Sequence, residues 1–226
     1  GYATIARAAG ARLQLGTEVE AILTQDGRVR GVRTPDGDVA ASAVVLAAGA
    51  WSGALAATAG LELPIRPVPR TVVTTGAFAG VPSRRTLVID MPSTFYFHRE
   101  ADGVLMGMGG ADVSTFDTRV DDRFVAEALL PRAVEVFPPV EEAPIRATWV
   151  GLYEMTPDHH PVIGETPVEG LVVAAGFSGH GFQQGPMAGR LVAEVVVGGA
   201  ARSVDIDALR FTRFAEEALV DEGHVV

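Results

Sequence analysis

The chain has 226 residues, 48% of them hydrophobic, which is enough to bury one large core or two small ones. Its formal net charge of −10 and pI of about 4.9 argue against nucleic-acid binding, because phosphates require a basic surface. The sequence contains no cysteine and no lysine, which excludes disulfides, thiolate chemistry and Schiff bases on this chain.

No apolar run approaches the roughly 20 residues of a membrane span, and no signal or transit pattern opens the chain. We therefore predict a cytoplasmic protein that binds neither membranes nor nucleic acid. The excess of arginine, alanine and glycine indicates a GC-rich bacterial genome.

The first part of the chain predicts short elements joined by tight turns. Residues 1–10 have a helical pattern, and residues 11–15 are expected to form a strand. Residues 19–23 and 28–34 alternate around Asp26-Gly27, a dipeptide that favours a hairpin.

The middle of the chain predicts a second unit. An apolar strand over residues 43–48 ends in the small-residue turn 49–52, and the proline-rich segment 63–70 is expected to be a domain boundary. Beyond it we expect a small antiparallel sheet and a helix over residues 122–136 that Pro131 interrupts. The strand candidates of this sheet are residues 71–75, 86–90, 94–98 and 104–108.

The chain is organised around residues 170–199. An apolar run of strand length leads into a loop with glycines at 176, 179 and 181, and a helical pattern continues to Gly198-Gly199. Strand, glycine loop and helix bring free backbone N–H groups and a positive helix end toward an electron-rich group. A plain turn between two buried elements is the alternative, but such a turn does not need His180 between two glycines.

Two further features near the end of the chain carry no predicted chemistry. Adjacent His159 and His160 point to opposite sides of an extended chain, so no metal site is predicted. Residues 211–219 are expected to form a terminal amphipathic helix that serves packing only.

The segment Gly176–Phe182 resembles the C-terminal flavin loop of the FAD-dependent amine oxidoreductases. That family includes D-amino acid and glycine oxidases, sarcosine oxidase, and dimethylglycine and proline dehydrogenases. The segment 149–161 resembles the sarcosine oxidase β-subunit and dimethylglycine dehydrogenase branch. The resemblance covers nearly the whole chain but matches only the second part of the family's sequence. The glycine-rich loop that holds the FAD pyrophosphate in the family has no counterpart here.

The resemblance therefore implies the C-terminal fragment of a flavoenzyme, which by itself would not hold FAD tightly. The fold expected is α/β plus α+β, with an antiparallel-sheet substrate domain inserted into a partial, Rossmann-like FAD-binding domain. The substrate domain would cover residues 67–146, and the FAD-binding domain residues 1–66 and 147–226.

The resemblance also implies site residues. FAD would be bound non-covalently, and a helix N-terminus near Gln183–Pro186 would stabilise negative charge on the reduced ring. Gly181 would permit close approach to that ring, with a positive φ as one expectation. The implied cofactor contacts are Val19, Ala48, Gly49, Trp51, Gly151, Gly176, Phe177, Ser178, Gly179, His180, Gly181, Phe182 and Gln183.

Tyr96 and His180 are the implied catalytic residues, acting by positioning and electrostatics, and Tyr96, His98 and Tyr153 are the implied substrate contacts. Tyr96 and His98 point to the same face of an alternating strand, although such aromatics also serve packing. Lysines or arginines of related oxidases are replaced here by Tyr153, Gly179 and Gln183. A partner for a substrate carboxylate must therefore come from another position or from outside this chain.

The implied reaction is oxidation of the C–N bond of a small amino acid or N-methyl amino acid, of the sarcosine, dimethylglycine, proline or D-amino acid type. Gly107 stands near the position of a lysine that promotes oxygen reactivity in monomeric sarcosine oxidases, so a dehydrogenase is at least as plausible as an oxidase. Two alternatives stay open: a non-catalytic remnant or partner-binding subunit, and an enzyme of the same fold acting on an alcohol. Partner subunits or a homo-oligomer also stay open.

Overall fold

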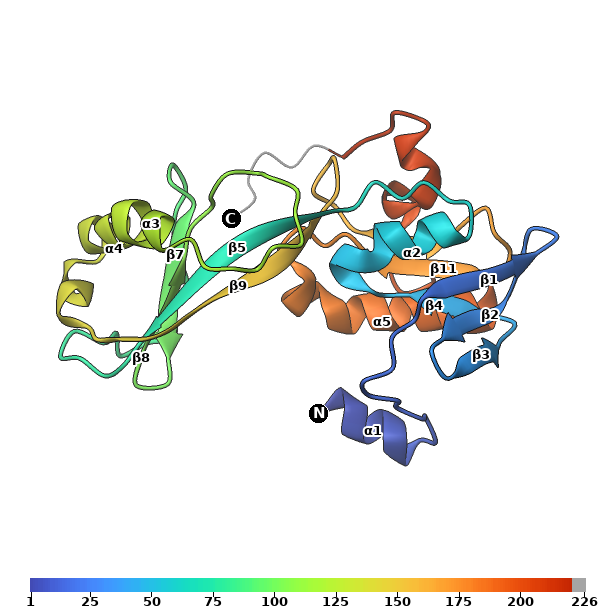
Figure 1. Ribbon diagram of the computed structural model, residues 1–226, viewed down its shortest axis with the longest axis horizontal. Helices are drawn as coiled ribbons and strands as arrows, with labels where there is room; N and C mark the ends of the chain where they lie inside the picture. Colours follow the sequence, from blue (N-terminus) through green and yellow to red (C-terminus); the bar gives the residue numbers. More distant parts are fainter. Residues whose placement is uncertain (221–226) are drawn as a thin grey trace.

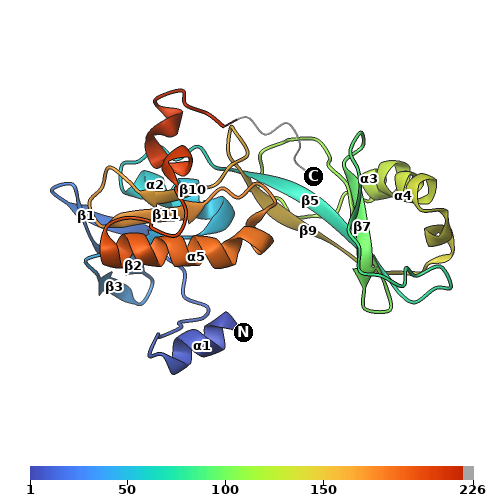
Figure 2. The same cartoon turned by 180° about the vertical axis from the view of Figure 1, so that it is seen from behind.

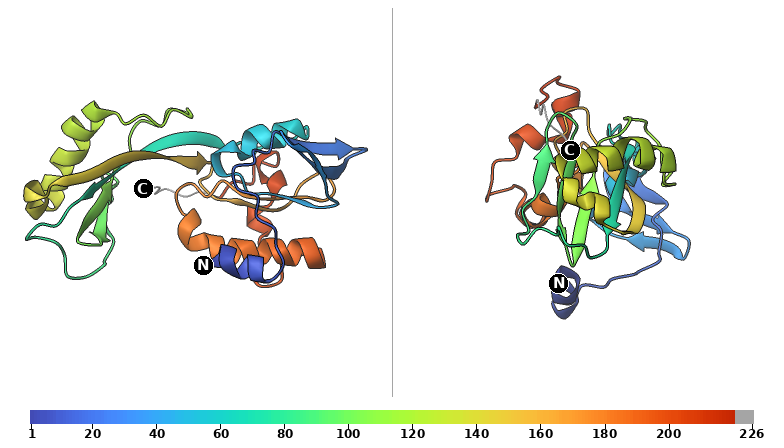
Figure 3. Two further views of the ribbon diagram at one scale, coloured as in Figure 1. Left: turned by 60° about the horizontal axis from the view of Figure 1, so that its bottom comes forward. Right: turned by 90° about the vertical axis from the view of Figure 1, so that its left-hand side faces the viewer.

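The computed structural model describes residues 1–220 and consists of two lobes that two long strands connect (Figure 1). Strands β5 (Arg66–Thr75) and β9 (Ile145–Met155) pair antiparallel over almost their full length. Figure 3 shows them side by side as they run from one lobe into the other. One continuous pair of strands therefore connects the two lobes.

One lobe is built on a sheet of β4 (Val44–Leu46), β10 (Val162–Glu165) and β11 (Leu171–Ala175), in the order β10-β11-β4. β11 is parallel to β4 and antiparallel to β10. Helix α5 (Gly181–Gly198) covers one face of this sheet, and α2 (Ser52–Thr58) lies on the other (Figure 2). Apolar side chains along β11 supply both cores, because successive strand residues point to opposite faces.

A three-stranded meander completes this lobe: β1 (Ala21–Gln25), β2 (Arg28–Thr34) and β3 (Gly37–Ala40). Asp26 and Gly27 both have positive φ, 53° and 74°, which is the backbone of a type I′ turn. The predicted hairpin is confirmed. Helix α1 (Tyr2–Ala8) buries none of its residues. The strand predicted over residues 11–15 is wrong, because no described strand lies beside these mostly exposed residues.

The other lobe is a five-stranded antiparallel sheet in the order β6-β7-β8-β5-β9, where β6 is Val88–Asp90, β7 is Phe95–Glu100 and β8 is Gly103–Gly107. One face packs against α3 (Asp122–Phe124), the π-helical turn Val125–Leu129 and α4 (Leu130–Val136). As predicted, the stretch 122–136 is not one continuous α-helix: the π-helical turn gives way to α4 directly before Pro131. It stands at the start of α4, where a missing N–H costs least.

The second half of the proline-rich segment, from Arg66 onward, belongs to β5, so these prolines stand in a strand that continues across the predicted domain boundary. Pro67 and Pro69 pair with β9 on one side, whereas β8 joins β5 only at Val72–Thr74. Proline is tolerated there because a strand edge without a sheet partner needs no donor. The proposed division into residues 1–66, 67–146 and 147–226 stays a prediction.

The remaining regular segments are short 3₁₀ turns: η1 (Gly49–Trp51), η3 (Pro138–Glu142), η4 (Asp207–Leu209) and η5 (Phe211–Phe214). The helix predicted over residues 211–219 is wrong, since only its first four residues form a 3₁₀ turn. Among the residues described, no helix combines the length and the apolarity that crossing a membrane requires.

Candidate active site

The glycine loop occupies residues 176–180, between the end of β11 and the start of α5. Gly176 and Gly179 have φ of +83° and +99°, a region that favours glycine. A Cβ on Gly176 would lie 2.5 Å from Cγ2 of Thr156, and one on Gly179 would lie 2.5 Å from Cε2 of Tyr153. Both positions require glycine. Gly181 has an ordinary φ, so the expectation of a positive φ there is wrong.

Helix α5 begins at Gly181, with His180 as its N-cap, and not near Gln183–Pro186 as predicted. Pro186 lies inside the helix rather than at its first position. As the sixth residue of the helix, Pro186 lacks the N–H that would donate to the Phe182 carbonyl, so the first turn has one intrahelical hydrogen bond fewer. Phe182 is 98% exposed, and Gln183 is exposed as well. The helix thus presents N–H groups and an uncovered apolar ring at the same end.

A second cluster of predicted cofactor residues surrounds a cavity of about 680 Å³ beside β4. Val19, Ala48 and Trp51 all line it. The Trp51 ring is 55% exposed and lies 5.4 Å from the Phe116 ring, measured between centroids. The structure therefore places Val19 beside Ala48 and Trp51, about thirty residues further along the chain, around one apolar space.

Glu154 of β9 lies between the glycine loop and the turn at Gly49, and no motif in the sequence predicts it. Its Oε2 accepts a hydrogen bond of 2.8 Å from the Gly176 N–H, and a Cβ on Gly49 would lie 3.9 Å from the same oxygen. Gly49 itself has φ of +55°. The only sequence signal was an acidic residue directly before a buried methionine and the Thr-Pro-Asp turn.

Burial raises the pKa of the Glu154 carboxyl, and hydrogen bonds from the backbone N–H groups of Gly176 and Phe177 lower it in part. Because the pKa of this carboxyl is higher in the folded than in the unfolded state, its ionisation as the pH rises destabilises the folded protein. Glu154→Gln keeps an oxygen acceptor for the Gly176 N–H but removes the charge. We expect the melting temperature of this variant, relative to wild type, to increase between about pH 4 and about pH 7. Thermal unfolding at each pH measures it, and a flat or falling difference contradicts the assignment.

The face of the five-stranded sheet that points away from α3 and α4 carries the predicted substrate residues. Tyr96 pairs with Gly107, Gly107 pairs with Val72, and two residues back along β5 Arg70 pairs with Gly151. Cross-strand partners share a face, so Tyr96, Arg70 and Gly151 lie on one side. Tyr153, opposite Val68, joins them.

The two phenols form a hydrogen bond with each other. Burial raises the pKa of Tyr96 to about 12 and also raises the pKa of Tyr153, so both hydroxyls are protonated at neutral pH. His98 shares the face but lies two residues further along β7, and its Nδ1 is 3.0 Å from the Arg99 carbonyl oxygen. The structure brings Tyr96 and Tyr153 together and places His98 apart from them.

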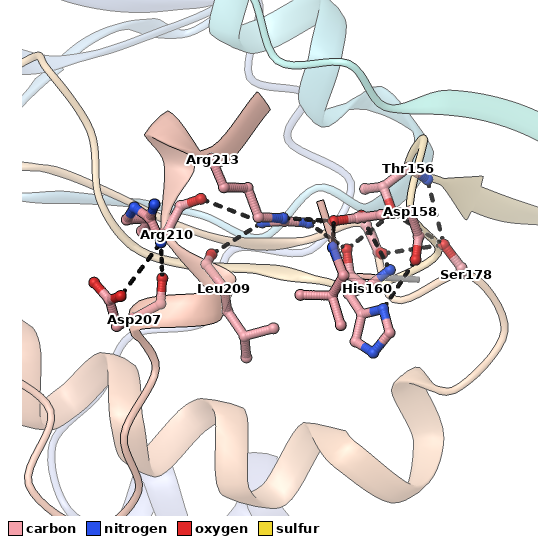
Figure 4. Close-up of polar contacts among 10 residues, drawn as sticks. Thr156, Asp158, His160, Ser178, Asp207, Leu209, Arg210 and Arg213 are labelled. Carbon is pink, nitrogen blue, oxygen red and sulfur yellow. Dashed lines mark hydrogen bonds and ion pairs between the residues drawn. The ribbon is translucent and has the colours of Figure 1, made fainter. Parts of the chain in front are cut away.

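Arg213, which lies in the segment 211–219 expected to serve packing only, holds the turn that follows β9. Arg213 Nε and Nη2 donate to the two Asp158 carboxylate oxygens over 2.7 and 2.9 Å, and Nη2 also donates to the His160 carbonyl over 2.8 Å (Figure 4). Thr156 Oγ1 donates to the same carbonyl, and Ser178 Oγ accepts from the Thr156 N–H. The buried pair therefore supports the glycine loop through one turn.

Residues 1–195 match the family described as DAO, FAD dependent oxidoreductase. Glycine oxidase of Geobacillus kaustophilus is 37% identical over 84% of this chain and 50% of its own length. Sarcosine oxidase subunit beta of an Arthrobacter species is 30% identical over 98% of this chain and 54% of its own. The crystal structure of L-proline dehydrogenase from P. horikoshii superposes with a TM-score of 0.90 and 29% identity, covering 97% of this chain and 59% of that one. The chain thus spans about half the length of the curated relatives it matches.

Proposed function

Since this chain belongs to the family of FAD-dependent oxidoreductases, we propose that the full-length protein oxidises the C–N bond of a small amino acid or N-methyl amino acid. The observation that carries the proposal is the close approach of Tyr153 to Gly179, on which a Cβ would lie 2.5 Å from the Tyr153 ring; here the face of the sheet that carries Tyr96 meets the glycine loop. Partner subunits and a cytoplasmic location belong to the same proposal, the former because one relative is named as a subunit.

The residues of this chain fit FAD. Gly179 is exposed and has no side chain, so a planar ring can approach the loop backbone closely from solvent. The first turn of α5 offers N–H donors and the positive end of an 18-residue helix. Gly49, Ala48, Trp51 and Val19 would hold the cofactor on the β4 side, and residues 176–183 on the α5 side. When bound, FAD supplies the two-electron acceptor that oxidation of an amine needs.

The protein groups orient the substrate and tune the site. Tyr96 and Tyr153, both protonated, act as hydrogen-bonding groups rather than bases. The α5 N-terminus favours negative charge in its vicinity. A Cβ on Gly107 would lie 2.5 Å from the Tyr96 hydroxyl oxygen, so a lysine does not fit there while Tyr96 keeps its position. This favours a dehydrogenase over an oxidase.

Anaerobic bleaching of the flavin tests the proposed function. We expect a small amino acid among glycine, sarcosine, dimethylglycine, proline and D-alanine to bleach the flavin absorbance of the full-length protein. An artificial dye should then reoxidise it faster than oxygen does. Bleaching by none of these compounds would contradict the proposed substrate class, and peroxide formation as fast as dye reduction would contradict the dehydrogenase.

A further inference from the structure

Arg70 is a nearly buried cation whose hydrogen bonds are incomplete. Its side chain is only 10% exposed. Nη2 donates to Oδ1 of Asp112 over 2.7 Å and Nη1 to the Pro69 carbonyl over 3.2 Å, but Nε is buried without a hydrogen-bond partner among the described residues. A buried donor that lacks a partner costs free energy, so its retention requires an explanation.

Arg70 lies beside two tyrosines and an uncovered glycine on one face of the sheet. Its Cζ lies 5.3 Å from the centroid of the Tyr153 ring, and its charge lowers the pKa of Tyr96 and of Tyr153, against the larger effect of burial. Gly151, its partner on β9, has open space where a side chain would stand. One guanidinium and two phenols thus lie on the face of the sheet where Gly151 leaves open space.

We propose that Arg70 receives the carboxylate of the amino-acid substrate, with Asp112 holding the guanidinium until the substrate binds. The inference rests on the proposed function and names the chain's own partner for the substrate's negative charge. A guanidinium suits this role because its planar array of donors matches a carboxylate. It also fits the sequence, since Tyr153, Gly179 and Gln183 offer no basic group.

Asp112 is suited to be displaced. Its side chain is 51% exposed, and it belongs to residues 108–121, which form no helix or strand. The backbone of this segment has separate attachments: Arg66 Nη1 donates to the Asp112 carbonyl over 3.1 Å, and the Thr115 N–H donates to the Pro67 carbonyl over 3.1 Å. The carboxylate can therefore leave Arg70 while the segment stays in place. Because the Asp112 carboxylate is half exposed, it can return to solvent when a substrate carboxylate takes its place on Arg70.

Two variants that break the same ion pair distinguish a carboxylate site from a structural contact. The probe is acetate, titrated by calorimetry into the flavin-loaded full-length protein at constant ionic strength, with acetamide as the uncharged counterpart. We expect Arg70→Met to weaken acetate binding by about tenfold or more, because a hydrogen bond to a charged group contributes about this much to affinity. Asp112→Asn, which removes the internal competitor, should strengthen it by about threefold.

If the ion pair is merely structural, both variants should change acetate affinity in the same direction. That result, or no change in either variant, would overturn the inference. Arg146→Met is the matched control, because Arg146 on β9 forms a 2.7 Å ion pair with Asp102 and is 51% exposed; it should leave acetate affinity unchanged. If Arg70→Met does not fold, Arg70→Lys is measured in its place. Acetate binding by Arg70→Lys that is as tight as in wild type would also overturn the proposed contact between guanidinium and carboxylate. Acetamide affinity should be the same in all variants.

The failure of this inference is separable from the failure of the proposed function. If amino acids bleach the wild-type flavin but acetate affinity follows neither Arg70 nor Asp112, the substrate carboxylate binds elsewhere. If no amino acid bleaches the flavin, the proposed function fails, whatever acetate does.

Discussion

Replacing Arg213 by methionine is expected to cost about 3–5 kcal/mol of unfolding free energy, the typical effect of breaking a buried ion pair. The Arg213 side chain is 0% exposed and that of Asp158 is 1% exposed, so Arg213→Met leaves an unpaired carboxylate in the interior. The His160 and Val220 N–H groups, which also donate to Asp158, cannot replace the lost charge. Urea unfolding of the purified protein measures the loss.

Arg210→Met is the matched control, since Arg210 stands three residues earlier in the same segment but is paired with Asp207 and Glu216 at the surface. It should cost little. The double variant Arg213→Met with Asp158→Asn should lose less than the sum of the two single variants, because the second change no longer leaves a buried charge unpaired. Additive losses would show that the two side chains do not act as a pair.

The same pair predicts a dependence on pH. Burial by itself would raise the pKa of Asp158, but the hydrogen bonds and the charge of Arg213 lower it to about 2. Because the folded pKa lies below the unfolded value, the contribution of Asp158 to stability is complete above about pH 4 and is lost as the pH falls toward 2. Asp158→Asn should be less stable than wild type at neutral pH and should lose less stability than wild type on acidification.

Local patterns predicted those parts of the fold that depend on local physics. The Asp26-Gly27 hairpin is confirmed because both residues adopt the positive φ that this dipeptide favours. That Pro67 and Pro69 belong to a strand is not predicted from the sequence, because proline is accepted in a strand only where one edge lacks a partner. No sequence pattern states which edge of a strand remains without a partner.

The candidate site likewise has parts that local sequence patterns predict and parts that they do not. The glycine loop was found from its composition, but the reasons for its glycines lie in Thr156 and Tyr153, which contact it from another part of the chain. Glu154, Arg70 and Arg213 act through partners between 22 and 55 residues away in sequence, a separation at which periodicity carries no information. Only the folded chain brings these three residues together with their partners.

The glycine loop gives the second large expected effect. Gly176→Ala should destabilise the protein by about 2–4 kcal/mol, combining the strain of a non-glycine residue at positive φ with a steric clash. The added Cβ would lie 2.5 Å from Thr156 Cγ2 and 3.3 Å from Ile65 Cδ1, and this region is buried, so neither neighbour can move into solvent. The measurement is urea unfolding of the flavin-free proteins, since bound FAD would itself raise the apparent stability.

Gly185→Ala is the matched control and should change stability in the opposite direction. Gly185 lies inside α5, where an added Cβ meets nothing within 4 Å, so alanine should stabilise the helix by about 0.5–1 kcal/mol. Gly181→Ala should lie between the two, because its φ is ordinary and its Cβ would meet Phe177 Cβ at 3.2 Å. If Gly181→Ala cost as much as Gly176→Ala, positive φ and contact with Thr156 would not be what fixes glycine in this loop. The path from Arg213 through Thr156 to the loop would then lose its steric basis.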